Sequence, residues 1–209
     1  MSDIQAILRQ RIADALTTPA PTLTRRDLRL PEVRGKAHAV IGMRRSGKST
    51  FLWQCLADRL AAGSPRDALL YLNLEDERLN GMTAIDLGGV IEEWFRQIPG
   101  IRDRTRATLF LDEVQLIPGW ETVARRIIDQ EQIDLFLSGS SAHLLSSEIA
   151  TSMRGRALPT TVYPFSFRET LRHVGLEPAK PWDRLPKAER SDLDARLRQY
   201  LLAGGFPEV

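Results

Sequence analysis

The chain has 209 residues, of which 29 are basic and 27 acidic, so its formal net charge at pH 7 is +2. Hydrophobic residues make up 43% and charged residues 27%, which are proportions of an ordinary globular protein and exclude a disordered, collagen-like or disulfide-rich chain. The near balance of charge provides no bulk attraction to nucleic acid or to anionic lipid.

Strand and helix patterns alternate along the chain. They predict a helix at 4–16, an arginine-rich strand or connector at 24–31, a strand at 37–41, a loop at 42–47 and a helix at 48–62. They then predict a strand at 68–74, a helix at 83–98, a strand at 108–111, a helix at 119–131, strands at 133–137 and 158–163, and helices at 166–174 and 187–203. Most strand runs are continuously apolar, which is typical of a parallel sheet covered by helices on both faces, as in an α/β protein.

The single cysteine and the pattern of apolar runs bear on location. Cys55 has no partner for an intrachain disulfide, which fits a reducing compartment, and its apolar helical position predicts an inert thiol. No run reaches the roughly 18 apolar residues of a membrane span, and the first 16 residues carry charges where a signal peptide would be apolar. The sequence therefore predicts a cytoplasmic protein without a membrane partner.

A complete phosphate-binding pattern follows the first predicted strand. Residues Gly42, Met43, Arg44, Arg45, Ser46, Gly47, Lys48 and Ser49 match G-x-x-x-x-G-K-[ST], and Thr50 comes directly after them. Glycine at these places lets backbone N–H groups surround phosphate oxygens, and the start of the following helix adds its dipole. Lys48 is predicted to reach the β- and γ-phosphates, and Ser49 to ligate Mg²⁺. Arg44 and Arg45 either contact phosphate or lie at the outer edge of the loop.

Two carboxylates end the third predicted strand. In a parallel sheet, the carboxyl ends of the strands face the ligand. Asp112 is therefore predicted to hold Mg²⁺, and Glu113 to orient or deprotonate the attacking water. Glu75 and Asp76 close the second strand, and they either face the same crevice, are solvated or form structural pairs. The guanine-reading Asn-Lys-x-Asp tetrapeptide is absent from the sequence, which favours ATP as the nucleotide.

Several segments together resemble one family. They are residues 42–50, Tyr71–Asp76, Leu111–Gln115 with Pro118–Glu121, Ser138–Ser141, Met153–Arg156 and Tyr163–Glu169. The sequence is similar, over about residues 30–209, to prokaryotic AAA-type P-loop ATPases that usually carry a C-terminal domain of unknown function. The resemblance implies a P-loop NTPase of the additional-strand type, with sheet order 5-1-4-3-2, ATP and Mg²⁺ as ligands, and hydrolysis by the adjacent glutamate.

The resemblance also implies a polar sensor and an arginine at the phosphate. Ser140 is the favoured sensor and Ser138 the other candidate, while Ser140 or Ser141 capping a helix is an equally good interpretation. Arg154 or Arg156 would stabilise the transferring phosphoryl group, either from the same chain or from a neighbouring subunit, which requires self-association. The alternative for each arginine is an ordinary salt bridge near the start of a strand.

These features predict an ATPase that acts as a motor or switch, in which nucleotide turnover shifts the helices at 166–203. The alternatives are a nucleotide-gated binding module without significant hydrolysis, and a DNA-acting ATPase with Arg125 and Arg126 on a basic surface. The expected organisation is an N-terminal helix and connector at 1–30, an ATPase core at 31–165 and a helical segment at 166–209. The final Gly-Gly-Phe-Pro turn is expected to lead into the C-terminal domain of a longer parent protein, which this chain lacks.

Overall fold

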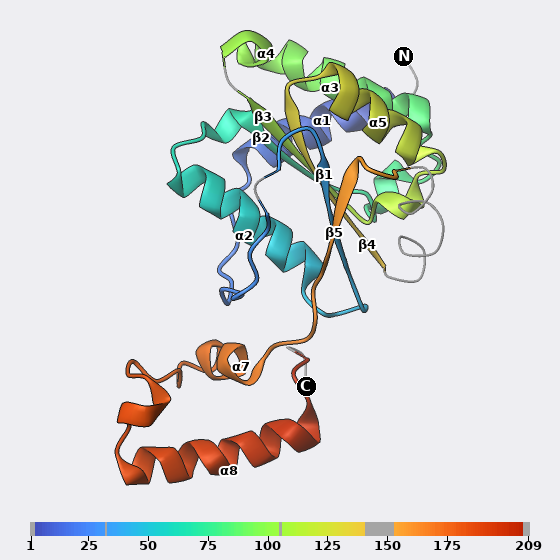
Figure 1. The fold of residues 1–209 in the computed structure, drawn as a ribbon. Coiled ribbons are helices and arrows are strands. Elements are labelled where there is room, and N and C mark those ends of the chain that lie inside the picture. Colours follow the sequence, from blue (N-terminus) through green and yellow to red (C-terminus); the bar gives the residue numbers. More distant parts are fainter. Residues whose placement is uncertain (1–2, 32, 105, 141–152, 207–209) are drawn as a thin grey trace.

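The computed structural model describes residues 3–31, 33–104, 106–140 and 153–206. Five parallel strands form one sheet in the order β2-β3-β4-β1-β5 (Figure 1). Their bounds are β1 Ala37–Gly42, β2 Leu69–Asn73, β3 Ala107–Asp112, β4 Ile133–Ser140 and β5 Ala157–Thr161. This is the predicted 5-1-4-3-2 order, and the predicted α/β class is confirmed.

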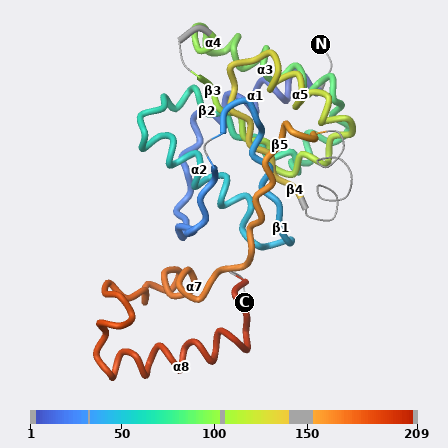
Figure 2. Tube along the Cα trace, viewed as in Figure 1, coloured from blue at the N-terminus to red at the C-terminus, as the bar shows by residue number. Residues whose placement is uncertain are grey.

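The described helices are α1 Asp3–Thr17, α2 Lys48–Ala61, α3 Ala84–Gln97, α4 Ile101–Arg104, α5 Trp120–Gln130, α7 Phe167–His173 and α8 Lys187–Ala203. Helices α1, α3 and α5 cover one face of the sheet, and α2 covers the other (Figures 1 and 2). Every residue of β1 and β3 is buried, because both strands lie inside the sheet under these two layers. The segment at 24–31 contains no strand and connects α1 to β1.

Strand β4 is longer than its apolar run predicts. Its ladder with β1 continues through the pairs Val40 with Ser138, Ile41 with Gly139 and Gly42 with Ser140. This pairing with β1 outweighs the weak strand propensity of serine and glycine. The extension carries Ser138 and Ser140 to the carboxyl edge of the sheet, beside the phosphate loop.

The C-terminal segment lies beyond the carboxyl edge of the sheet, below it in Figure 1. It has a small apolar cluster of its own, made of Leu171, Leu185 and Leu193 with Phe167 against them. The last described residues of this segment lie against its first residues. The Phe165 N–H donates to the Gly205 carbonyl oxygen at 2.6 Å. The Tyr200 hydroxyl also donates to the Phe165 carbonyl oxygen, at 2.7 Å. Phe165, which precedes α7, is therefore hydrogen-bonded both to Tyr200 of α8 and to Gly205, which follows α8.

Among the described residues, no helix combines the length and the apolar character that crossing a membrane requires.

Buried His38 in β1 predicts a pH dependence of stability. Its imidazole is 6% exposed, with its ring centroid 4.8 Å from that of Phe136. Burial and the nearby Arg59 charge lower its pKa from the ordinary 6.5, against an opposing effect of Asp134. The unfolded chain therefore binds a proton at a higher pH than the folded chain does. The contribution of neutral His38 to the free energy of unfolding is therefore complete above pH 6.5. It is lost as the pH drops from there toward the lowered pKa.

The expected result is that the free energy of unfolding, from urea titrations at a series of pH values below 7, falls less steeply for His38→Gln than for the wild type. Comparing the two slopes cancels the other titrating groups. Equal slopes would contradict a neutral, buried imidazole.

Candidate active site

The phosphate loop connects β1 to α2 and takes a backbone path that depends on two residues with positive φ. Arg45 has φ 63° and Gly47 has φ 93°. Gly42 is required for a different reason, because a Cβ there would lie 2.3 Å from the Val162 carbonyl oxygen and 2.7 Å from Ser46 Oγ. Successive left-handed and right-handed residues direct N–H groups toward one side of a loop, which is the arrangement that binds anions.

Unpaired donors at this loop fit a phosphate group. The first N–H groups of α2 have no partner within the helix, and they lie at its positive end. Ser46 Oγ is buried and, within the described part of the chain, has no hydrogen-bond partner. The loop therefore offers backbone and hydroxyl donors to a phosphorylated ligand, as its sequence predicts.

Lys48 connects the loop to the acidic strand end. Its side chain is only 5% exposed, and its Nζ lies 3.8 Å from Glu113 Oε1. The same Nζ donates a hydrogen bond to the Met43 carbonyl oxygen at 3.2 Å. The lysine that is predicted to bind phosphate and the glutamate that is predicted to act on water therefore lie at one site.

Asp112 is buried at the end of β3 and receives a hydroxyl donor on each carboxylate oxygen. Tyr71 Oη donates to Oδ2 at 2.5 Å, and Ser138 Oγ donates to Oδ1. Burial raises the pKa of Tyr71 and the Asp112 charge raises it further, so the phenol stays a neutral donor. The Tyr71 hydroxyl also interacts with Ser49. Ser49 and Asp112, the two predicted magnesium ligands, therefore share a neighbour.

Glu113 is held in a left-handed conformation, with φ 55° and ψ 46°. For a residue other than glycine this costs on the order of 1–2 kcal/mol. Two contacts hold it: its N–H donates to Ser138 Oγ at 3.1 Å, and Gln115 Nε2 donates to Glu113 Oε2 at 2.5 Å. The conformation turns this side chain toward Lys48, away from the line of β3.

The predicted sensor serines lie at the same edge. Ser138 contacts both members of the acidic pair. Ser140 ends β4 in register with Gly42, which starts the phosphate loop. The interpretation of Ser141 as a helix cap falls within 141–152, outside the described residues. Ser140 remains the predicted sensor and Ser138 becomes a positioning residue for Asp112 and Glu113.

Arg156 lies at the amino ends of the strands, whereas the phosphate loop lies at their carboxyl ends. The prediction that Arg156 completes the site of its own chain therefore needs correction. Its carbonyl oxygen accepts from the Ala37 N–H at 2.8 Å, at the start of β1. Gly42 is five residues further along, or about 17 Å at the usual rise of a strand. The Arg156 guanidinium pairs instead with Asp129, with an Nε–Oδ1 distance of 3.2 Å. Arg154 belongs to the same turn before β5, so the same-chain role is not supported for either arginine.

The other charged residues take structural positions. Asp76 pairs with Arg78 at 2.8 Å and with Arg11 of α1 at 2.9 Å. The Arg78 hydrogen bond is the main cause that lowers the pKa of Asp76 to about 2, so structural pairing is the correct interpretation of this carboxylate. Arg126 donates to the Gly88 carbonyl oxygen at 3.1 Å and lies 3.9 Å from Glu131, so it joins α5 to α3. Arg44 and Arg45 are exposed on the loop.

The sheet order, with a glycine-rich loop between β1 and α2 and an acidic pair at the end of β3, defines a P-loop nucleoside-triphosphatase fold. A family model described as an AAA domain matches residues 34–171. This is more than half of the chain, and the chain belongs to that family.

Several known proteins are similar to the chain. An uncharacterised protein of Methanocaldococcus jannaschii is 33% identical over 184 residues, which are 88% of this chain and 38% of that protein. An uncharacterised protein of Haemophilus influenzae is 31% identical over 171 residues, which are 81% of this chain and 39% of that protein. The chain thus spans about two fifths of the length of these curated relatives.

Two solved structures are also similar. The Aeropyrum pernix ORC1 protein in complex with DNA has a TM-score of 0.47 at 15% identity, over 94% of this chain and 48% of that one. The C. elegans PCH-2 structure has a TM-score of 0.45 at 12% identity, over 82% of this chain and 44% of that one.

Proposed function

We propose that this chain binds ATP with Mg²⁺ at the loop 42–49 and hydrolyses it to ADP and phosphate. The observation that carries the proposal is the distance of 3.8 Å between Lys48 Nζ and Glu113 Oε1, because it brings the phosphate-binding lysine to the acidic pair. Membership of the AAA domain family supports the same function.

The roles follow from the positions of the side chains. Backbone N–H groups of the loop and Lys48 bind the phosphates, while Ser49 and Asp112 supply the hard oxygen ligands that Mg²⁺ prefers. The metal, when bound, neutralises phosphate charge. Tyr71 and Ser138 fix the orientation of the Asp112 carboxylate by their two hydrogen bonds. Glu113 orients the attacking water and accepts its proton, and Ser140, whose backbone lies in register with Gly42, is the proposed sensor of the γ-phosphate.

The proposal is tested by the unfolding temperature with and without Mg-ATP, together with phosphate release. The wild type is expected to be stabilised by Mg-ATP, because a ligand that binds only the folded state adds to its stability, and to release phosphate. Lys48→Ala is expected to lose both effects. The matched control is Lys187→Ala, which removes an exposed lysine at the start of α8 and is expected to behave like the wild type.

Two outcomes separate the alternatives. Stabilisation of the wild type by Mg-ATP without phosphate release would favour a nucleotide-gated binding module. A wild type that is not stabilised at all, or a Lys48→Ala variant that is stabilised equally, would refute nucleotide binding at this loop.

A further inference from the structure

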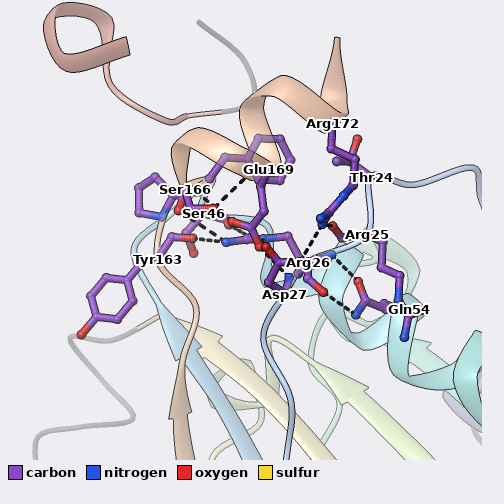
Figure 3. Close-up of polar contacts among 12 residues, drawn as sticks. Thr24, Arg25, Arg26, Asp27, Ser46, Gln54, Tyr163, Ser166, Glu169 and Arg172 are labelled. Carbon is purple, nitrogen blue, oxygen red and sulfur yellow. Dashed lines mark hydrogen bonds and ion pairs between the residues drawn. The ribbon is translucent and has the colours of Figure 1, made fainter. Parts of the chain in front are cut away.

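A buried arginine of the connector before β1 contacts three separate segments of the chain. Arg26 is only 6% exposed, and Figure 3 shows it between the phosphate loop, the chain that follows β5 and helix α7. Its own backbone is anchored on α2, because its N–H donates to Gln54 Oε1 at 2.7 Å and its carbonyl oxygen accepts from Gln54 Nε2 at 3.2 Å. The guanidinium therefore starts from a fixed position.

Each part of the guanidinium binds a different segment. Nη1 donates to the Ser46 carbonyl oxygen of the phosphate loop at 3.0 Å. Nη2 donates to the Tyr163 carbonyl oxygen at 2.6 Å, and Nε donates to Glu169 Oε1 of α7 at 2.9 Å. Only the planar, five-donor group of arginine can make these contacts together, since a lysine ammonium is a single point of charge.

The contact with Ser46 acts on the part of the loop that is predicted to bind phosphate. In a trans peptide the carbonyl oxygen and the next N–H point in opposite directions. Holding the Ser46 carbonyl toward Arg26 therefore directs the Gly47 N–H away from Arg26, to the other side of this peptide. Arg26 also lies close behind Gly47, where a Cβ would come 3.2 Å from Nη1.

Glu169 connects the same arginine to the folding of α7. It is 4% exposed, and its Oε2 accepts from the Ser166 N–H at 2.8 Å, which completes a capping box at the start of the helix. Its Oε1 also accepts from the Asp27 N–H at 2.8 Å. Burial favours the neutral acid, but the hydrogen bonds from Arg26, Ser166 and Asp27 outweigh it and lower the pKa of Glu169. The pair is an ionised, fully bonded link between the connector and α7.

We propose that the Arg26–Glu169 pair positions the phosphate loop and couples nucleotide binding there to the docking of the segment at 166–206. The proposal rests on the proposed function. A bound phosphate favours the loop conformation in which the Ser46 carbonyl faces Arg26, and that conformation favours the contact with Glu169. Coupling of this kind is reciprocal, so losing the contact between Arg26 and Glu169 weakens nucleotide binding by the same factor that nucleotide binding strengthens that contact.

The test uses Mg-ADP as the probe, because ADP is not consumed. In the wild type, Mg-ADP is expected to slow amide hydrogen exchange in α7. Arg26→Lys keeps a positive charge beside Glu169 but loses the planar guanidinium that contacts three segments at once. We expect this variant to bind Mg-ADP about tenfold more weakly and to show no slowing of exchange in α7 when Mg-ADP is added. Glu169→Gln keeps an oxygen for the helix cap and is expected to show the same two changes. Circular dichroism melts establish that both variants fold.

The matched control is Asp27→Asn. Asp27 and Arg172 form an ion pair at 2.9 Å that also joins the connector to α7, without a side-chain contact to the phosphate loop. This variant is expected to keep the affinity for Mg-ADP and the nucleotide-dependent protection. Equal losses in Asp27→Asn and Arg26→Lys would show that α7 docking in general is responsible and would overturn the role of Arg26.

Failure of the coupling and failure of the proposed function give different results. A wild type that binds Mg-ADP while α7 exchange does not change overturns the coupling alone, as does an Arg26→Lys variant of wild-type affinity. A wild type that does not bind Mg-ADP overturns both.

Discussion

Replacing Glu113 with glutamine is expected to reduce ATP hydrolysis by about 10²- to 10⁴-fold, the usual contribution of a general base, while Mg-ATP binding is retained. An amide of the same shape cannot accept the proton of the attacking water. It can still accept the hydrogen bond that Gln115 donates to Oε2, so the left-handed backbone at this position keeps its support. Steady-state phosphate release and a nucleotide-binding titration on the same preparation measure the two effects separately.

The matched control for this experiment is Glu75→Gln. Glu75 is an exposed carboxylate just after β2, and its N–H donates to Asn73 Oδ1 at 2.9 Å. The substitution Glu75→Gln makes the same chemical change at the end of a different strand, and ATP hydrolysis is expected to be unaffected. Wild-type hydrolysis in Glu113→Gln would remove the proposed role of this glutamate. An equal loss in Glu75→Gln would place the base elsewhere.

The parts of the fold that are local in sequence could be predicted from it. The apolar runs locate β1 to β4 to within a few residues, because strands covered on both faces have few polar positions to obscure their pattern. The less buried β5 is also located to within a few residues. The loop 42–49 is a contiguous motif, and its chemistry is contained in its own backbone. The strand order is not local information, and its prediction came from the family resemblance.

The contacts that complete the site could not be predicted, since they join distant positions. In the sequence, Tyr71 is one more residue of an apolar strand pattern. Only the pairing of β2 with β3 brings its hydroxyl to Asp112. Arg26 and Glu169 are 143 positions apart, and each also fits an exposed charged residue in its own segment. Apart from the family resemblance of its segment, the sequence marks Glu169 by its place three residues after Ser166, which is typical of a capping box but not of an ion pair.

The same-chain role of the two arginines is not supported, for a related reason. Arg154 and Arg156 precede a strand, and in a parallel sheet the residues before a strand lie at the edge opposite the ligand. Position along the chain brings them close to β5, but the direction of β5 carries them away from the phosphate loop. An arginine at this edge can reach a phosphate loop only if the loop belongs to a second copy of the chain. The prediction of an arginine from a neighbouring subunit therefore stays open, and it can be tested by mixing variants.

A mixture of two inactive variants is expected to recover ATP hydrolysis. One partner is Lys48→Ala, and the other is Arg154→Ala or, in a second experiment, Arg156→Ala. Each variant by itself is expected to be inactive. An arginine supplied in trans contributes about 10³- to 10⁵-fold to turnover. In a mixed assembly, a subunit with an intact loop can receive the arginine of a Lys48→Ala neighbour. With equal amounts and random assembly, about a quarter of the interfaces combine the two intact halves. Phosphate release by the mixture, compared with the sum of the separate preparations, measures the effect.

Asp129→Asn separates a role in trans from a structural role for Arg156. Asp129 forms the ion pair that holds Arg156 within its own chain, and the Arg156 side chain is 45% exposed. If Arg156 only stabilises the fold, Asp129→Asn and Arg156→Ala remove the same ion pair and reduce activity equally. If it acts on a neighbouring site, Arg156→Ala alone abolishes hydrolysis, because Asp129→Asn leaves the guanidinium present and free to extend. A mixture no more active than the sum of its parts, for both arginines, would show that neither acts in trans.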